Sequence, residues 1–583
     1  TFTQPSGVDD LGRLALGFTN VNLSASERIT ANNQGSLAVY QSQGAYVPGE
    51  GVSYSGGNLN ILTPLLTGTA GSVNHMTAGG AVTVSAPAGS TAAAVDSEAL
   101  GAELAITGQT LLLDTAVVLP SGKLVLTAED DLTLADGAQI DMAGRSIEFM
   151  DDEDATQYSW GGDVTLQSHA GDIRQAAGSA IDLSAEYNQG GRLTAIALAD
   201  GAGLVDLQGQ ILGSASGYYE AGGTWVPYAA GGVDIRAQRL GNSGTLSDQF
   251  AALNQRLNDG EVLGLRHFQL KQGDLSIGND LRANDVSVSL DNGHLTVAGT
   301  VDASGERVGS IRLAGKQGLT LTGNAVLDAH GETLRLDSYG KTIDSPNRAV
   351  VELNSGDGQL LLASGARIDL RHGTDDARVQ ADPSLHDGRD RGTLELNAPR
   401  LGGARAGDID IDASGNLAIR GARSIAVNAV QRYDDAAYGT DEAASGRPYQ
   451  IIDQAYLDAK HADSTAFINA ALLNDNLLGN KLAGLNNASY ADAFRLRPGV
   501  EIVSAEADGD LIVSGDLDLS GHRYDSLNPH TQKTTVYGSG EVGSLVMRAG
   551  GDLELNGVHR APPSRHRSGS GGSRPACRLR NRG

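Results

Sequence analysis

The sequence predicts an all-β protein built as a right-handed parallel β-helix, a solenoid, with short helical insertions. Three observations favour this fold: 78 of the 583 residues are glycine, only 4% are aromatic, and one strand–turn–strand unit recurs along the chain. The glycine share is nearly twice the usual value of roughly 7%. Hydrophobic residues still reach 40%, so a core of Val, Ile, Leu and Ala can be buried and general disorder is excluded.

The recurring unit is an alternating strand, a turn with glycine, a second alternating strand and then an apolar–Asp–apolar triplet. Its clearest copy runs from Gly162 to Ser184 and ends on Asp182. Several gaps between copies are about 41 residues long, which fits two solenoid turns of roughly twenty residues each. The other copies end on Asp141, Asp302, Asp328, Asp369, Asp412 and Asp518.

The strands in these units are short and show a period of two. Val164 and Leu166 fall on one face, as do Leu319 and Leu321. Strands this short are unstable alone, so we expect them to stack on like strands, with glycine in the tight corners between them. A β-sandwich array is the alternative, and it would need hairpin signals such as Asn-Gly at regular intervals.

The pattern divides the chain into five segments. Residues 101–448 are predicted to form the solenoid, and residues 495–557 to add further turns of it. Residues 1–100 are Ser/Thr/Gly-rich with irregular strands, either separate or further turns of the same solenoid. Residues 449–494 are expected to be a helical insertion. Residues 558–583 are a basic, low-complexity tail.

Two interruptions of the strand pattern predict helices. Residues 245–262 are expected to form a short helix opened by a Ser or Asp cap. In the 449–494 insertion, Ser464 is the expected cap and Gly479 the expected break. The apolar face of that insertion consists of Ile468, Ala471, Leu472, Leu478, Leu482 and Leu485.

Charge and composition exclude several function classes. The net charge is −27, and because residues 559–583 hold seven arginines and no acid, the rest of the chain is more acidic still. Such a chain repels phosphate backbones, so nucleic-acid binding is not expected. No apolar run is long enough for a transmembrane segment. The first residues, Thr-Phe-Thr-Gln-Pro, do not resemble a signal peptide, so we expect either a cytosolic chain or one whose start has been removed. The single cysteine, Cys577, lies in the tail, so we expect no disulfide.

One stretch of the sequence is more specific than the repeats. Residues 496–502 read Leu-Arg-Pro-Gly-Val-Glu-Ile, and Gly509-Asp510-Leu511 follows. Together with residues 120–128 and 543–557, this stretch resembles filamentous-haemagglutinin-like exoproteins of Gram-negative bacteria. The resemblance covers roughly residues 100–557.

The resemblance implies a function and a location. Members of the family are β-helical adhesins exported through a partner outer-membrane transporter by two-partner secretion, so the chain is expected to be secreted or displayed on the cell surface. Their secretion domain carries Asn-Pro-Asn motifs, which we do not find, so the chain resembles an interior piece without its export signal. The periodicity is lost after Gly557, which indicates a shifted reading frame, with a genuine basic linker as the alternative.

The expected function is therefore non-catalytic: a structural adhesin segment that mediates attachment or biofilm formation, with host or matrix glycans or proteins as partners. A β-helical polysaccharide lyase or hydrolase is the alternative, because such enzymes place aspartates on neighbouring turns for calcium binding or acid–base chemistry. The stalk of a contact-dependent toxin is a further alternative. No catalytic residue, cofactor or metal site is expected, since the twelve histidines are scattered without the paired spacing of a zinc site.

The repeated aspartates have a simpler interpretation than catalysis. An Asp at the end of a strand commonly accepts hydrogen bonds from the turn that follows it. We expect that role for the whole series, and we expect its members to lie too far apart to cluster, since Asp182 and Asp302 are separated by 120 residues.

Two local features are candidate ligand sites. The acidic run Asp151-Asp152-Glu153-Asp154 lacks the spacing of a calcium loop, so a solvated loop is expected there. Tyr218, Tyr219, Trp225 and Tyr228 concentrate aromatic residues between two glycines. They are the candidate binding residues, because flat apolar faces with polar rims suit sugar rings. A loop that packs on the flank of the solenoid is the alternative.

Overall fold

The computed structural model describes residues 12–48, 51–92, 94–95, 98–148, 156–372, 389–440, 445–528, 539–556 and 559–560. It is mostly β, with 46% strand and 8% helix, so the prediction of an all-β protein is confirmed. Its large sheets are parallel, which is consistent with the solenoid-like arrangement expected from the repeats.

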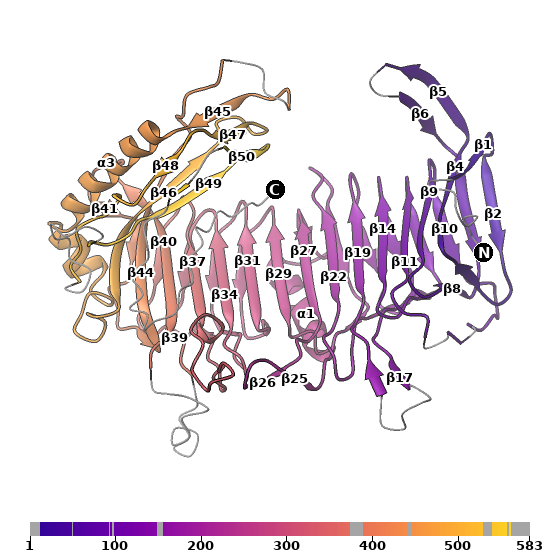
Figure 1. The fold of residues 1–583 in the computed structure, drawn as a ribbon, viewed down its shortest axis with the longest axis horizontal. Coiled ribbons are helices and arrows are strands. Elements are labelled where there is room, and N and C mark those ends of the chain that lie inside the picture. The colour runs from indigo at the N-terminus through magenta and orange to yellow at the C-terminus, as the bar shows by residue number, and fades with distance from the viewer. Residues whose placement is uncertain are drawn as a thin grey trace.

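The largest sheet has 17 strands and runs the length of the molecule (Figure 1). All its neighbours pair in parallel except β41, which is antiparallel to β40. Its strands are β1 (Arg13–Leu16), β4 (Gln34–Tyr40), β9 (Val73–Ala78), β11 (Glu103–Gly108), β14 (Lys123–Ala128), β19 (Asp163–Ser168), β22 (Arg192–Ala197), β27 (Gly232–Ala237), β29 (Leu265–Leu270), β31 (Asp285–Leu290), β34 (Ser310–Gly315), β37 (Val350–Asn354), β40 (Gly392–Leu401), β41 (Asp408–Ile409), β44 (Ala422–Tyr433), β46 (Phe494–Val503) and β49 (Ser544–Arg548).

A second series of strands follows the first along the chain, in three parallel sheets. These strands are β2 (Asn20–Ser24), β7 (Asn58–Leu62), β10 (Val82–Ser85), β12 (Leu111–Asp114), β15 (Leu132–Leu134), β20 (Ile173–Gln175), β23 (Leu204–Leu207) and β28 (Arg239–Leu240), then β30 (Leu275–Ile277), β32 (Leu295–Val297), β35 (Leu319–Leu321), β38 (Leu360–Leu362) and β42 (Ile411–Asp412), and finally β45 (Tyr449–Ile452), β47 (Asp510–Val513) and β50 (Leu553–Leu555).

A third series follows the second in many of the repeats. We call the seven repeated aspartates the aspartate column; six of them lie on this series, and Asp412 lies on β42 of the second series. Its strands are β3 (Ile29–Ala31), β8 (Leu65–Gly68), β13 (Ala116–Val118), β16 (Gln139–Asp141), β21 (Ala180–Asp182) and β24 (Gln210–Leu212), then β33 (Thr300–Asp302), β36 (Val326–Asp328), β39 (Arg367–Asp369) and β43 (Ala418–Arg420), and finally β48 (Leu517–Asp518) and β51 (His559–Arg560).

Strands of successive repeats pair in a continuous register, with one shift in the large sheet, between Gly392 and Thr393 where β40 pairs with β44. In the repeats β14–β15–β16 and β19–β20–β21, Leu124 is opposite Val164 and Leu126 is opposite Leu166, and all four side chains are fully or almost fully buried. Burial of each such side chain contributes about 1.5–3 kcal/mol. The period of two in the sequence therefore sets which face of each strand points into the core.

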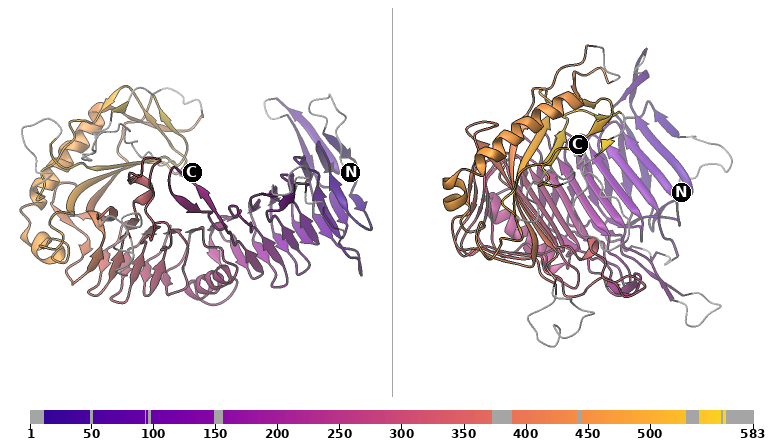
Figure 2. Two further views of the ribbon diagram at one scale, coloured as in Figure 1. Left: turned by 60° about the horizontal axis from the view of Figure 1, so that its bottom comes forward. Right: turned by 60° about the vertical axis from the view of Figure 1, so that its left-hand side comes forward.

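The inward-facing side chains of the three series form one continuous core, which extends from Ile29 to Tyr524. A second, smaller core lies between Tyr433 and Met547, where residues of β45, β47 and β50 pack with Leu457 of α3 (Gln454–Ala471). Figure 2 shows the strands of the large sheet side by side from two further directions, with the C-terminal strands and the helix at one end.

The helix expected within 245–262 is present as α1 (Leu246–Asp259), but its cap differs from the prediction. Thr245, and not Ser or Asp, is the N-cap, and it forms a capping box with Asp248. Phe250 packs edge-on against Phe268 of β29, with ring centroids 4.8 Å apart. This contact fixes α1 against the strands.

The insertion at 449–494 contains α3 (Gln454–Ala471), whose apolar side lies against the core as expected. Its cap and its end differ from the prediction. Asp453 is the N-cap, because its carboxylate accepts the Tyr456 N–H at 2.8 Å. Ser464 is instead buried within α3, where its hydroxyl accepts a hydrogen bond from Arg400 at 3.1 Å. The α-helix ends before Gly479, which lies inside the π-helical turn Leu477–Lys481.

Among the described residues, three two-stranded antiparallel sheets interrupt the repeats: β5 (Ser42–Val47) with β6 (Gly51–Ser55), β17 (Ser146–Glu148) with β18 (Thr156–Tyr158), and β25 (Tyr218–Glu220) with β26 (Trp225–Pro227). Figure 1 places the last two on the same lower edge of the strands. The acidic run 151–154 and residues 561–583 of the predicted tail lie outside the described residues. Within the described ranges, no helix has the length and apolar character needed to cross a bilayer.

Candidate ligand-binding surface

The four aromatic residues predicted as binding candidates lie on or beside the β25–β26 hairpin. Tyr219 pairs with Val226 across the two strands, and the turn between them is closed by a hydrogen bond from Ala221 N–H to the Thr224 carbonyl at 3.0 Å. The turn requires Gly222 and Gly223, since both have positive φ angles, +67° and +121°. Val226 is buried and anchors the hairpin, whereas Trp225 is 64% exposed.

The hairpin is held against the segment 331–347 and against Glu306. The Thr224 hydroxyl accepts the Leu336 N–H at 2.7 Å, and the Tyr218 hydroxyl donates to the Glu306 carboxylate at 2.8 Å. The hydrogen bond to Glu306, and the negative charge of this carboxylate, raise the pKa of Tyr218. Trp225 and Tyr218 are therefore exposed on a backbone that hydrogen bonds hold in place.

Further aromatic side chains continue this surface. Tyr187 lies directly beside Gly217, and its ring centroid is 4.7 Å from that of Tyr158. Tyr219 and Tyr228 form a similar pair, with centroids 5.3 Å apart. We call the whole group the aromatic edge; its members are Tyr158, Trp160, Tyr187, Tyr218, Tyr219, Trp225, Tyr228 and Tyr339.

The aromatic edge contains both tryptophans of a chain that is otherwise poor in aromatic residues. Trp160, Tyr187 and Tyr339 are exposed, and Tyr339 is 86% exposed. These residues come from separate segments of the chain, so the sequence pattern did not connect them with the four candidates. The parallel bridge between Ala185 and Ala215 joins the segment that contains Tyr187 to the segment that leads into the hairpin, since it places residue 187 beside residue 217.

The aspartate column serves the turns, as predicted. The Asp182 carboxylate accepts hydrogen bonds from Ser184 N–H at 2.9 Å and from the Ser184 hydroxyl at 2.6 Å. Each of the other six aspartates likewise accepts the N–H of the residue two positions on: Asp141, Asp302, Asp328, Asp369, Asp412 and Asp518.

The expectation that these aspartates lie too far apart to cluster is wrong. Asp328 is in register with both Asp302 and Asp369 on the neighbouring strands, and Asp141 is in register with Asp182. Sequence separation is a poor guide here, because stacking brings equivalent positions of successive repeats within one strand spacing, about 4.8 Å.

Asp328, His330 and Asp369 form a group whose ligand atoms lie within 4.8 Å of one another, close enough to hold a metal ion. Their own contacts compete with that role. His330 Nδ1 lies 2.6 Å from Asp328 Oδ1, and the Arg371 guanidinium donates to both oxygens of Asp369, with Nη2 2.6 Å from Oδ2. A cation would therefore meet the positive charge of Arg371 at the site.

The same contacts shift the pKa values of His330 and Asp369. The hydrogen bond to Asp328 raises the pKa of His330, against the opposing effect of burial. Burial alone would raise the pKa of Asp369, but the hydrogen bonds and charge of Arg371 hold it below its ordinary value. Asp328 thus favours the charged form of His330, and Arg371 favours the charged form of Asp369, at the edge of the strands.

No family model matches the chain, and no curated protein or solved structure is similar to it.

Proposed function

We propose that this chain is a structural segment of a secreted or surface-displayed filamentous adhesin, and that its aromatic edge binds glycans. One observation carries the proposal: exposed aromatic rings gather on one edge of the parallel strands, on a hairpin that hydrogen bonds fix in position. Aromatic faces give sugar rings a flat apolar surface, and the neighbouring carboxylates can accept hydrogen bonds from sugar hydroxyls.

The proposed architecture is a right-handed parallel β-helix. The pairing of three series of strands supports it, since repeats such as β14–β15–β16 and β19–β20–β21 pass once through all three and pair in register. In such a rod the loops between repeats project from one edge at regular intervals. Several weak glycan contacts along the rod would then act together and raise the overall avidity.

The resemblance to filamentous-haemagglutinin-like exoproteins supports the same function. Its most specific stretch, residues 496–502, lies within β46, a strand of the large sheet. The proposal includes export through an outer-membrane transporter of the two-partner type, and attachment or biofilm formation as the biological role.

The test is binding of the purified chain to a panel of polysaccharides. Because both tryptophans belong to the aromatic edge, the intrinsic tryptophan fluorescence of the chain reports on it directly. The double variant Tyr218→Ala/Trp225→Ala is expected to weaken binding by about tenfold, since aromatic stacking contributes about 0.5–1.5 kcal/mol per ring. Because this variant lacks one of the two tryptophans, its affinity is measured by calorimetry, which does not depend on tryptophan fluorescence.

Tyr438→Ala is the matched control. Tyr438 is 50% exposed, as Tyr218 is, and its hydroxyl also donates to a glutamate, Glu506, but it lies outside the aromatic edge. Equal losses in both variants, or no binding to any glycan of the panel, would contradict the proposal. Release of reducing ends or unsaturated sugars from a bound glycan would favour the lyase or hydrolase instead.

A further inference from the structure

Helix α3 joins the two hydrophobic cores at the C-terminal end of the described chain. Its Phe467, Ile468 and Ala471 belong to the large core, whereas Leu457, nearer the start of the helix, belongs to the small core. The small core also contains Leu517 of β48. The N-terminal half of α3 is therefore packed through the small core, and its C-terminal half through the large one.

The polar side of α3 contacts one segment of chain, residues 517–524. The Gln454 side chain donates to the Asp518 carbonyl at 3.2 Å and accepts the Asp518 N–H at 2.8 Å. One turn further along the helix, Asp458 Oδ1 lies 3.1 Å from His522 Nε2. Because residues four apart share one face of a helix, these contacts hold the segment along α3.

A pair of histidines lies in the same contact. His461 of α3 and His522 of the segment stack face to face, with ring centroids 4.2 Å apart and an interplanar angle of 2°. His461 Nδ1 also lies 3.0 Å from the Tyr524 hydroxyl. We call Asp458, His461, His522 and Tyr524 the histidine latch. Because the charge of an ordinary histidine changes near pH 6.5, the charge in the latch depends on pH.

The charges within the latch favour one proton on the pair and oppose a second. Hydrogen bonds from Gln454 and His522 lower the pKa of Asp458, and the charges of both histidines add to this effect, so a first proton is stabilised by this carboxylate. Burial raises the pKa of Tyr524 to about 12, so its hydroxyl stays neutral. A second proton places like charges on rings whose centroids are 4.2 Å apart, and these charges repel each other.

Further charged groups lie on the elements packed around the latch. Arg400 of β40 donates to Ser464, which lies on α3 one turn beyond His461, and the buried Arg523 follows His522 in the chain. Neither supplies a negative charge to the pair. Three nearby carboxylates form ion pairs with other side chains: Asp435 with Lys460, Asp463 with Arg405, and Glu541 with Arg497.

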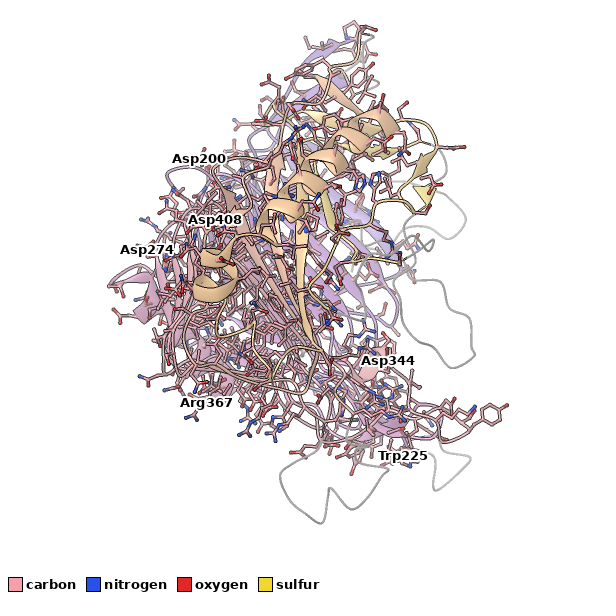
Figure 3. All side chains as sticks on the ribbon, turned by 90° about the vertical axis from the view of Figure 1, so that its left-hand side faces the viewer. Asp200, Trp225, Asp274, Asp344, Arg367 and Asp408 are labelled. Atoms are coloured by element: carbon pink, nitrogen blue, oxygen red, sulfur yellow. The ribbon has the colours of Figure 1, made fainter. Side chains whose placement is uncertain are left out.

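We propose that the histidine latch is a pH-sensitive switch, which holds residues 517–524 on α3 at neutral pH and releases them when both histidines are protonated. Release separates Leu517 from Leu457, so the small core opens with the latch. The switch is independent of glycan binding and lies apart from the aromatic edge. In Figure 3, α3 lies at the front in the upper half of the molecule, and Trp225 lies near the bottom.

Hydrogen exchange of the full chain at pH 7.5 and pH 5.0 tests the switch. At pH 5.0 an ordinary histidine, with a pKa of about 6.5, is protonated, and ordinary carboxylates are still largely charged. The open form takes up the second proton more readily than the closed form, so acid favours opening. After correction for the intrinsic pH dependence of exchange, residues 454–461 and 517–524 should lose about tenfold in protection at pH 5.0. Residues 246–259 of α1 should keep theirs.

Three variants assign the effect to the latch. His461→Phe keeps a ring in the stack but cannot be protonated, so protection of both segments should be equal at the two pH values. Asp458→Asn removes the carboxylate that stabilises the first proton, so release should begin at a higher pH than in the wild type. His169→Gln is the matched control, because His169 is exposed after β19, outside the latch, and it should behave as the wild type does.

The same measurements can overturn the proposal. Equal protection of the wild type at both pH values would contradict it, as would a tenfold loss in His461→Phe. An equal loss in α1 would also contradict it, since acid would then loosen the whole chain. Far-UV circular dichroism at pH 7.5 checks that each variant is folded. His461→Gln removes the same charge with a smaller side chain, and it makes the same test if His461→Phe does not fold.

Discussion

Asp328 and Asp369 occupy the same position on neighbouring strands, β36 and β39, and each accepts the backbone N–H of the residue two positions on. The same hydrogen bond closes the turn after each of the seven repeated aspartates, so one carboxylate satisfies a backbone N–H where a strand ends. Stacking then places carboxylates of successive repeats side by side. This proximity would be unfavourable if His330 and Arg371 did not lie between them.

The turn role of the aspartates predicts the effect of removing one acceptor. Asp182→Ala should lower the free energy of unfolding by about 1 kcal/mol, because the Ser184 N–H loses its partner. Asp182→Asn keeps an oxygen that can accept the same bond and is the control. Urea unfolding measures both, and equal midpoints for the alanine variant and the wild type would contradict the prediction.

The contact between His330 and Asp328 predicts a pH dependence of stability. A histidine whose pKa is raised by folding stabilises the folded state fully below its unfolded pKa of about 6.5, and this contribution is lost as the pH rises through the folded pKa. The wild type should therefore lose more stability between pH 6 and pH 8 than Asp328→Asn, in which the largest cause of the shift is removed.

NMR titration of histidine-labelled protein tests the same contact directly. The pKa of His330 should fall in Asp328→Asn, although Asp369 and Glu332 remain nearby and still favour its charged form. An unchanged His330 titration in this variant would show that Asp328 does not control it.

The packing of α1 predicts a large effect of one core substitution. Phe268→Ala should cost about 3–5 kcal/mol, because Phe268 is almost fully buried against Phe250 and the space cannot be filled. Gln255→Ala, on the exposed face of α1, should change stability by less than about 0.5 kcal/mol. Hydrogen exchange should also show faster opening of α1 in Phe268→Ala.

Much of the fold could be predicted from the sequence, because it follows from local patterns. The alternation of apolar and polar residues indicates which side of each strand faces the core, as at Leu124 and Leu126, and the repeated aspartates mark the ends of strands. Arg266 could not be predicted in this way. It occupies an inward position of β29 and is fully buried, which lowers its pKa to about 9. Its guanidinium donates to the Val262 carbonyl and the Asn254 side chain, which α1 and the residues after it supply.

The candidate site, too, could be predicted from the sequence only where its residues are close together in the chain. Four aromatic residues adjacent in the sequence were identified, whereas Tyr187 and Tyr339 join them only through pairing between repeats. The contacts of Arg348, Arg391 and Arg423 with Asp344 could not be predicted, because the three arginines come from separate parts of the sequence. Ser464 was assigned as a cap because its type suits that role, but Arg400, 64 residues away, is its partner. Contacts between repeats depend on register, which a single sequence does not reveal.

Tyr187 gives a final prediction, in which stability and binding change separately. Its backbone has a positive φ of 46°, a conformation that favours glycine over tyrosine. Tyr187→Gly should therefore gain backbone stability that offsets the lost ring contact with Tyr158, and the unfolding midpoint should change little. Glycan affinity should nevertheless fall several-fold, because the variant removes an exposed ring from the aromatic edge. A large loss of stability together with unchanged affinity would show that the ring of Tyr187 serves packing and not binding.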